Sequence, residues 1–349
     1  MRTRFLAALL VAPLAALALT APAAHADPDP DLSITKVELS RSSVAVSSLN
    51  TVPVKLTVTG GYDSSDPQNA NLTLHAILKR TAGTGMENIL TSMELFRTAG
   101  TTQNGTWEGN VNIPSTANGT FEAYGVMTGA FFPGSGSMTT ETLVPNPPKL
   151  LITGTNQPKI TARVLPDPLP FGQGYSIRWS VINGQTGKPY GTRLKVWLAN
   201  DNGCVESFGG PEYLTDTNGY VTKAYPSSLA DYGNCLLLPG NPAPNGGLGV
   251  IPNRPGIVTA TPSKTSAPVG TIVPVNGTVA GAPNCSINLQ RLYGATAWRT
   301  VGTAQIRQSG RFTVNAQPAY KGLIYYRVSF PGCFHFKSGV SKTFTIKGT

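Results

Sequence analysis

The sequence predicts an all-β protein built from tandem β-sandwich modules, and three observations support this prediction. The chain contains 38 glycines and 29 prolines, which leaves few stretches long enough for helices. Short segments alternate apolar and polar residues with a period of two, the pattern of strands with one buried face. These segments recur about every ten residues with turn residues between them, a spacing typical of sandwiches.

The alternation extends along the whole chain. In residues 52–58 four apolar side chains share one face, while Pro53, Lys55 and Thr57 share the other. The same period predicts strands at four further places, which are residues 72–78, 177–181, 194–198 and 324–330. Trp179 is in register with the apolar residues of its segment and Trp107 with those of another, so both are predicted to be core residues.

Residues 1–26 are predicted to be a signal peptide. Arg2 and Arg4 supply the positive start, residues 5–19 are apolar, and residues 24–26 (Ala-His-Ala) form a small-x-small cleavage site. The apolar stretch is shorter than the roughly 20 residues that span a bilayer, although an uncleaved anchor is the alternative. We therefore expect a secreted, extracellular protein with no transmembrane segment in the mature chain, and association with a cell wall is one location we consider for it.

The four cysteines are Cys204, Cys235, Cys285 and Cys333, all in the mature part. An even number in an exported protein predicts disulfides. Of the three pairings we favour the sequence-local one, Cys204–Cys235 and Cys285–Cys333, in which each bridge contributes roughly 3.5–4 kcal/mol on the chain-entropy model. A metal site is the alternative, but no cysteine pair has the close spacing of zinc ligands, and we expect no metal.

Two proline-rich stretches, at residues 145–148 and 239–255, predict module boundaries, because proline lacks a backbone donor and favours extended connectors. The second stretch could instead be a long loop inside the middle module. Taking both as boundaries divides the mature chain into residues 27–148, 149–255 and 256–349, called here the first, second and third modules.

Several segments resemble a known family. The matching stretches of the third module are residues 275–279 (Val-Asn-Gly-Thr-Val), 288–292 and 326–332. Those of the second module are residues 186–191 and 214–221, and those of the first are residues 105–109, 113–114 and 119–121. They are similar to the tandem immunoglobulin-like repeats of secreted actinobacterial surface proteins, including repeats of the invasin type. The resemblance implies tandem immunoglobulin-like β-sandwich domains with a spacer, adhesion or binding role, and it supplies no catalytic residue.

Catalytic chemistry has few candidate residues. The mature chain has two histidines: His75, predicted on the solvent face of a strand, and His335, predicted in a loop or hairpin after Cys333. Neither a Gly-x-Ser-x-Gly nor a His-Glu-x-x-His motif occurs. We predict that the protein is not an enzyme and needs no cofactor; an active site assembled between modules is the remote alternative.

Two other features have ordinary structural interpretations. The oxygen-rich runs at residues 63–67, 201–203 and 216–219 could contribute calcium ligands, but Asp, Asn and Gly also form hairpin turns, which is the favoured interpretation. Trp197 faces away from the apolar residues of its segment, so it is exposed or covers a module interface. A single exposed tryptophan is weak support for carbohydrate binding.

Charge is distributed unevenly between the modules. The mature chain has 25 Lys and Arg against 17 Asp and Glu, and the net charges of the three modules are −5, +3 and +10. The third module has no carboxylate side chain. Its ten basic residues, which we predict to contact a polyanion, are Lys264, Arg291, Arg299, Arg307, Arg311, Lys321, Arg327, Lys337, Lys342 and Lys347.

The predicted function is that of a non-enzymatic binding or structural protein outside the cell. A strongly positive field attracts polyanions in a salt-dependent manner, so the expected partner is an anionic cell-wall polymer or an acidic polysaccharide. Another surface protein is an alternative partner, and nucleic acid is not expected as a specific one because no base-reading motif accompanies the charge. A carbohydrate-binding accessory protein is the alternative function, and the charge could also serve solubility alone.

Overall fold

The computed structural model describes residues 29–63, 65–69, 71–128, 141–200, 204 and 212–349. The predicted signal peptide lies outside these residues. Apart from two three-residue 3-10 turns, η1 (Ser115–Ala117) and η2 (Ser227–Leu229), the regular structure of the described residues is β-strand. The predicted fold class, tandem immunoglobulin-like β-sandwiches, is therefore confirmed. Within the same residues no helix is long and apolar enough to cross a membrane.

The first sandwich consists of two sheets. One has the order β1-β3-β7-β6 and the other β2-β10-β8-β4-β5, with β9 paired to β8. The bounds are β1 (Leu32–Leu39), β2 (Ser43–Ser47), β3 (Thr51–Tyr62), β4 (Leu74–Ala82), β5 (Ile89–Thr91), β6 (Phe96–Gly100), β7 (Gly105–Pro114), β8 (Gly119–Thr128), β9 (Thr142–Leu143) and β10 (Lys149–Thr155).

Strand β10 places the end of the first sandwich later than residue 148. It pairs in parallel with β2 and antiparallel with β8. The prolines of residues 145–148 therefore lead into a last strand of this sandwich, and Pro148 O accepts a hydrogen bond from Ala123 N at 3.1 Å. Pairing with β2, which lies about a hundred residues earlier, cannot be recognised from local composition.

The second sandwich has a three-stranded sheet of order β11-β12-β15 and a four-stranded sheet of order β14-β13-β16-β17. The last of these strands lies inside the proline-rich stretch 239–255, so this part of the stretch is a paired strand of the second sandwich rather than a loop or a connector. The bounds are β11 (Pro158–Leu165), β12 (Tyr175–Asn183), β13 (Lys195–Asn200), β14 (Glu212–Leu214), β15 (Tyr220–Tyr225), β16 (Asn234–Leu237) and β17 (Gly247–Val250).

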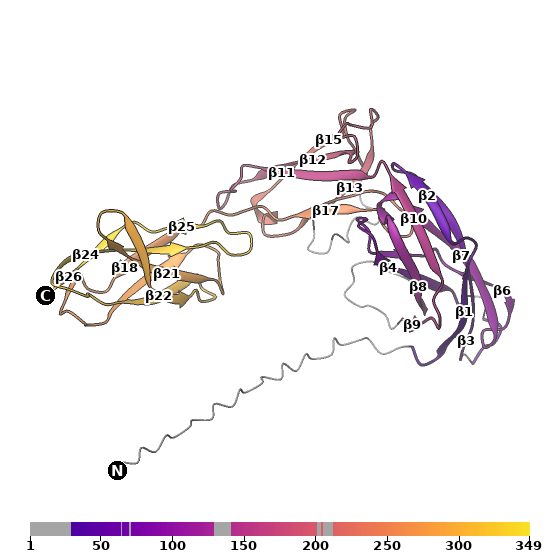
Figure 1. Ribbon diagram of the computed structural model, residues 1–349, viewed down its shortest axis with the longest axis horizontal. Helices are drawn as coiled ribbons and strands as arrows, with labels where there is room; N and C mark the ends of the chain where they lie inside the picture. The colour runs from indigo at the N-terminus through magenta and orange to yellow at the C-terminus, as the bar shows by residue number, and fades with distance from the viewer. Residues whose placement is uncertain (1–28, 64, 70, 129–140, 201–203, 205–211) are drawn as a thin grey trace, which may run out of the picture.

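The third sandwich packs a sheet of order β18-β20-β23 against one of order β19-β26-β24-β21-β22, with β25 paired to β24. The bounds are β18 (Val258–Pro262), β19 (Ser266–Ala267), β20 (Val273–Val279), β21 (Ser286–Tyr293), β22 (Ala297–Gln305), β23 (Arg311–Ala316), β24 (Gly322–Phe330), β25 (Gly339–Val340) and β26 (Phe344–Gly348). The three sandwiches follow one another in a curved row, with the third at one end (Figure 1).

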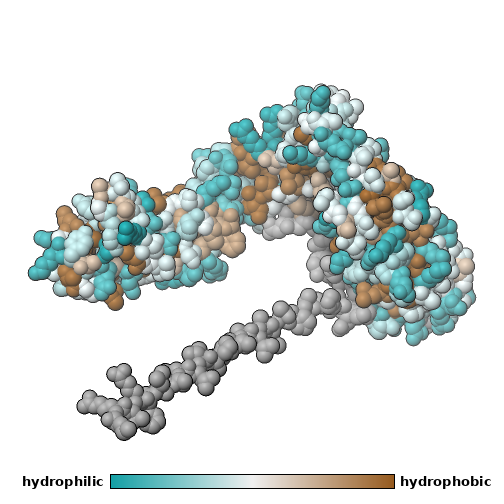
Figure 2. All heavy atoms as spheres, viewed as in Figure 1, coloured by the Kyte–Doolittle hydropathy of each residue, from teal (hydrophilic) through white to brown (hydrophobic). Residues whose placement is uncertain are grey.

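Each sandwich has its own apolar core, and the period-two prediction holds in all three. Val54, Leu56 and Val58 are fully buried on one face of β3, and Trp107 and Trp179 are fully buried as predicted. Burying such a side chain contributes roughly 1.5–3 kcal/mol. On the face in Figure 2, hydrophilic and hydrophobic residues are interspersed over the surface of the third sandwich.

Both disulfides have the sequence-local pairing. Cys204 is bonded to Cys235 and Cys285 to Cys333, and these bonds span 31 and 48 residues of sequence. The second bond joins the residue before β21 to the loop after β24, so both loops lie at the same end of the third sandwich.

His75 departs from its predicted position on a solvated face. All five residues from Leu74 to Leu78 are buried, and His75 is only 4% exposed. Its Nδ1 lies 3.1 Å from Ser92 O, so the segment after β5 covers the face of β4 that points away from the core. A cover of this kind depends on a distant loop, which strand periodicity does not detect.

Candidate functional site

The ten basic residues of the third sandwich are spread over its surface. Eight of them are exposed, while Arg291 and Arg327 are half-buried. No described residue forms an ion pair with any of the ten. The eight exposed residues are Lys264, Arg299, Arg307, Arg311, Lys321, Lys337, Lys342 and Lys347.

In the first and second sandwiches, by contrast, exposed lysines form ion pairs with carboxylates. Lys55 pairs with Glu108 at 2.9 Å, and Lys195 pairs with Glu212 at 3.0 Å. Such surface pairs add little stability, but they neutralise charge locally. The third sandwich has no carboxylate side chain to do this, so its positive field is balanced only by ions or ligands from solution.

Arg327 is held in place on the solvent face of the larger sheet. Its guanidinium lies 4.4 Å from the ring centroid of Trp298 on β22, and its Nε donates to Gln290 Oε1 at 2.8 Å. The tryptophan is half-buried beneath this charge. Its ring is therefore partly covered by a cation, which makes Trp298 a poor stacking platform for a neutral sugar.

Trp197, the other candidate for an exposed tryptophan, is not a platform for sugar stacking either. Trp197 is half-buried and packs against the small cluster of Ala199, Cys235 and Leu237. Trp197 is therefore neither exposed nor at a module interface, because the residues it packs against belong to its own sandwich. None of the four tryptophans is an exposed platform.

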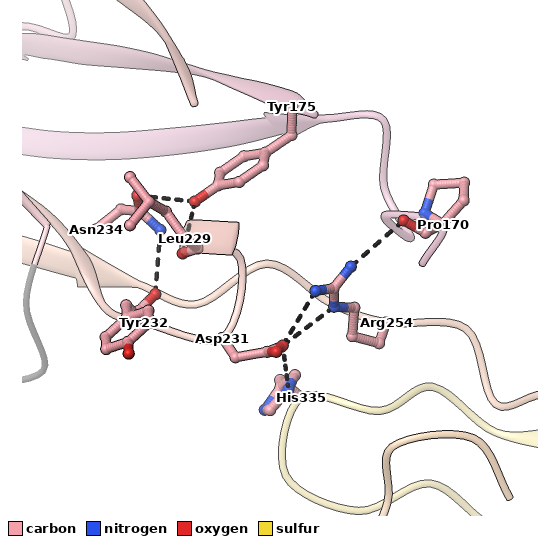
Figure 3. Close-up of polar contacts among 8 residues, drawn as sticks. All are labelled: Pro170, Tyr175, Leu229, Asp231, Tyr232, Asn234, Arg254 and His335. Carbon is pink, nitrogen blue, oxygen red and sulfur yellow. Dashed lines mark hydrogen bonds and ion pairs between the residues drawn. The ribbon is translucent and has the colours of Figure 1, made fainter. Parts of the chain in front are cut away.

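The junction between the second and third sandwiches is built around Arg254 (Figure 3). This residue is only 3% exposed. Its Nε and Nη2 donate to Asp231 Oδ1 at 3.2 and 3.1 Å, and its Nη1 donates to Pro170 O at 3.3 Å. The guanidinium also lies 5.2 Å from the ring centroid of Phe171. A buried guanidinium needs this many partners to offset its lost hydration.

The backbone of Arg254 continues the junction into the third sandwich. Arg254 N donates to His335 O, and Lys337 N donates to Arg254 O, both at 2.8 Å. His335 lies in the tight turn between Cys333 and Phe336, as predicted, and this turn contacts Arg254, with His335 Nε2 3.9 Å from Asp231 Oδ1. Burial lowers the pKa of His335; Asp231 raises it and Arg254 lowers it further.

Arg254 and Asp231 were not identified from the sequence. Their partners, Pro170 and Phe171, lie more than fifty residues away in the chain, so only the tertiary structure brings these groups together. One signal was available: Arg254 is the only charged residue in the stretch 239–255. A lone charge in a proline-rich segment between two modules is a reasonable candidate for a junction residue.

The oxygen-rich turns behave as turns where the structure describes them. Asp216 Oδ1 accepts hydrogen bonds from Asn218 N at 2.9 Å and Tyr220 N at 2.8 Å. The run at residues 201–203 lies outside the described residues. Among the described residues, no three His, Cys, Asp or Glu side chains form a group that could hold a metal ion.

Comparison with known proteins gives only structural likenesses. No family model matches the chain, and no curated protein matches it. A three-domain fragment of titin (I67–I69) has 10% identity and a TM-score of 0.26, covering 91% of this chain and 98% of its own. A marsupial T cell receptor has 8% identity and a TM-score of 0.24, covering 90% and 100%.

A third solved structure is longer than this chain. A Salmonella alpha-2-macroglobulin variant has 11% identity and a TM-score of 0.21, covering 93% of this chain and 23% of its own. At these identities and scores, none of the three structures implies anything about function.

Proposed function

We propose that this chain is a secreted, non-enzymatic immunoglobulin-like protein that associates with an anionic cell-wall polymer or acidic polysaccharide through its third sandwich. The observation that supports this proposal is the set of ten cations without a carboxylate on a sandwich at one end of the row. Polyanions bind such a surface by displacing its counter-ions, so the association is strong at low salt and weak at high salt.

The two disulfides and the predicted signal peptide support an extracellular location, because disulfides persist in oxidising compartments. The surroundings of the two histidines among the described residues also favour a non-enzymatic role. Among the described residues, His335 is the histidine closest to a carboxylate, and that carboxylate, Asp231, is already paired with Arg254. The junction holds the third sandwich at the end of the row, where it can reach a surface.

The test compares two variants of the whole mature chain that lose the same number of charges. One variant replaces Lys264, Arg311, Lys342 and Lys347 by Gln, and the other replaces Arg41, Lys159, Arg163 and Lys188, which are also exposed. Retention on purified cell walls is measured at about 0.01 M and about 1 M salt, between which the screening length falls from about 30 to about 3 Å.

We expect the wild-type chain and the second variant to be retained at low salt and released at high salt. The first variant should bind roughly tenfold more weakly or worse. Equal weakening of both variants would mean that net charge alone is responsible, and retention that is independent of salt would contradict an electrostatic association.

A further inference from the structure

A cavity of about 390 Å³ opens at the end of the third sandwich that lies away from the Arg254 junction. Its walls come from the loop after β19, the loop after β23, and the strands β21 and β22. Gly270 N, which donates to Pro318 O at 2.9 Å, joins the two loops. The volume is in the range of small-ligand pockets. Its lining includes Val269, Ile272, Arg291, Val301, Asn315 and Gln317.

Arg291 is the only charged residue of this lining, and a second guanidinium lies beside it. Arg291 and Arg299 are directly opposite each other in the β21–β22 register. Both guanidinium groups lie against the ring of Tyr293, with their carbons 4.4 and 5.0 Å from its centroid. Like charges placed directly opposite each other on a sheet repel.

No group of the described structure compensates this repulsion. The Tyr293 hydroxyl accepts a hydrogen bond from Arg291 Nη2, and the buried Tyr326 hydroxyl also interacts with Arg291 from the opposite strand position, but a phenol provides no negative charge. Arg291 Nε is buried and has no hydrogen-bond partner among the described residues. Among the described residues the pair of guanidinium groups thus has no negatively charged partner, and an oxyanion from solution would supply one to the guanidinium nitrogens that face the cavity.

The walls of the cavity suit the rest of such a ligand. Val269, Ile272 and Val301 are all exposed aliphatic side chains, with Ile272 60% exposed. Aliphatic walls around one charged group fit a molecule that has an apolar carbon face as well as an anionic group. Monomers of acidic sugars and of polyol phosphates have both features.

We infer that this cavity is a binding site for one carboxylate or phosphate group of an acidic carbohydrate or polyol polymer, with Arg291 as the ligand-contacting cation and Arg299 raising the local potential. This inference rests on the proposed function and gives it a defined site. The rest of the basic surface would then act as a non-specific field around one specific pocket.

The experiment uses the intact mature chain and three small probes: glucuronate, glycerol phosphate and glucose. Binding is measured by titration calorimetry and by saturation-transfer NMR on the probe. We expect one or both acidic probes to bind and glucose not to bind. Glucuronate binding alone would indicate a uronate-containing polymer as the source, and glycerol phosphate binding alone would indicate a phosphate-containing one.

The variants Arg291→Gln, Arg299→Gln and the control Arg311→Gln each remove one positive charge. Arg311 lies on β23 in the other sheet and is exposed, so it tests charge loss away from the cavity. We expect Arg291→Gln to weaken binding of the acidic probe about tenfold or more, Arg299→Gln by a smaller factor, and Arg311→Gln by less than about twofold. Arg291→Lys, which keeps the charge but loses the fork, should not restore full affinity.

Equal effects of Arg291→Gln and Arg311→Gln, binding of glucose at the affinity of the acids, or no binding of either acid would each overturn the inference. An unchanged thermal midpoint and the response of Arg291→Lys separate a local effect from misfolding. Retention of the same variants on cell walls distinguishes the two proposals. If the protein is retained on walls but binds neither acidic probe, the pocket inference fails and the proposed surface association stands.

Discussion

The two junctions of the molecule use different chemistry, although one segment contributes to both. Asn241 and Asn245, near the start of the stretch 239–255, accept hydrogen bonds from Asn112 Nδ2, at 2.9 Å, and from Thr116 Oγ1 of the first sandwich. Arg254, near its end, forms the charged junction with the third sandwich. A segment that composition marks as an extended connector therefore positions both neighbours of the second sandwich.

The difference between the junctions predicts different sensitivities. The first–second junction depends on neutral hydrogen bonds, each worth about 1 kcal/mol. Glu87 of the first sandwich also lies at this junction, because a Cβ added at Gly246 of the second sandwich would be only 3.5 Å from Glu87 Oε1. The second–third junction depends on one buried guanidinium, and the loss of a partner there leaves a larger cost. The five predictions below test this contrast.

The largest effect is expected when the disulfide beside the charged junction is removed. Cys333 is hydrogen-bonded through its backbone to Phe336, so the Cys285–Cys333 bond secures the loop that contacts Arg254. Replacing both cysteines by Ala should destabilise the third sandwich by about 4 kcal/mol on the chain-entropy model, for a span of 48 residues. Denaturant unfolding checks this value. If the contacts between Arg254 and the loop after β24 are unchanged in the variant, the loop is held in place without the disulfide.

The next largest effect is expected for Arg254→Met. The substitution keeps most of the volume and removes the contacts to Asp231, Pro170 and Phe171. Because Asp231 is 67% exposed and can rehydrate, we expect a loss of about 2–3 kcal/mol, measured by denaturation of the mature chain, and an increased maximum dimension in small-angle scattering.

The matched change at the neutral junction is Asn112→Ala, which removes the bond to Asn241 O. It should cost about 1 kcal/mol or less and leave the relative position of the second and third sandwiches unchanged. A loss as large as that of Arg254→Met would contradict the proposed contrast between the two junctions.

These junction residues also mark how far the sequence predicts the structure. Strand faces such as Val54, Leu56 and Val58 follow from periodicity, because alternation is a local consequence of strand geometry. The disulfide pairing follows from sequence proximity. The position of β10, the burial of His75 and the partners of Arg254 each depend on segments distant in sequence, which no local pattern encodes. The ten cations were identified by composition, but the placement of Arg291 opposite Arg299 needed the strand register.

A fourth prediction concerns the response of the neutral junction to pH. Burial raises the pKa of Glu87 to about 7, while Arg80 acts to lower it. The folded state therefore binds this proton more tightly than the unfolded chain, whose carboxyl has a pKa of about 4.3. The resulting stabilisation is fully present below about pH 4.3 and is lost as pH rises through about 7.

Glu87→Gln should accordingly stabilise the mature chain at pH 8, by about 1–2 kcal/mol after allowance for partial exposure, and have little effect at pH 4. The measurement is the thermal midpoint of both chains across this range. If wild type and variant differ equally at all pH values, the side chain is not a titrating group of this junction.

The smallest effect is expected at the charged junction, and it has the opposite sign. Burial lowers the pKa of His335, so the unfolded chain, with a pKa of about 6.5, binds this proton more tightly than the folded one. The stabilisation is present above about pH 6.5 and is lost as pH falls through the folded pKa. Protonation would also place a third charge beside Arg254 and Asp231.

His335→Gln should reduce the loss of stability between pH 7.5 and pH 5, and scattering should show less change in maximum dimension on acidification than for wild type. An unchanged acid response would show that His335 is not the group responsible for it.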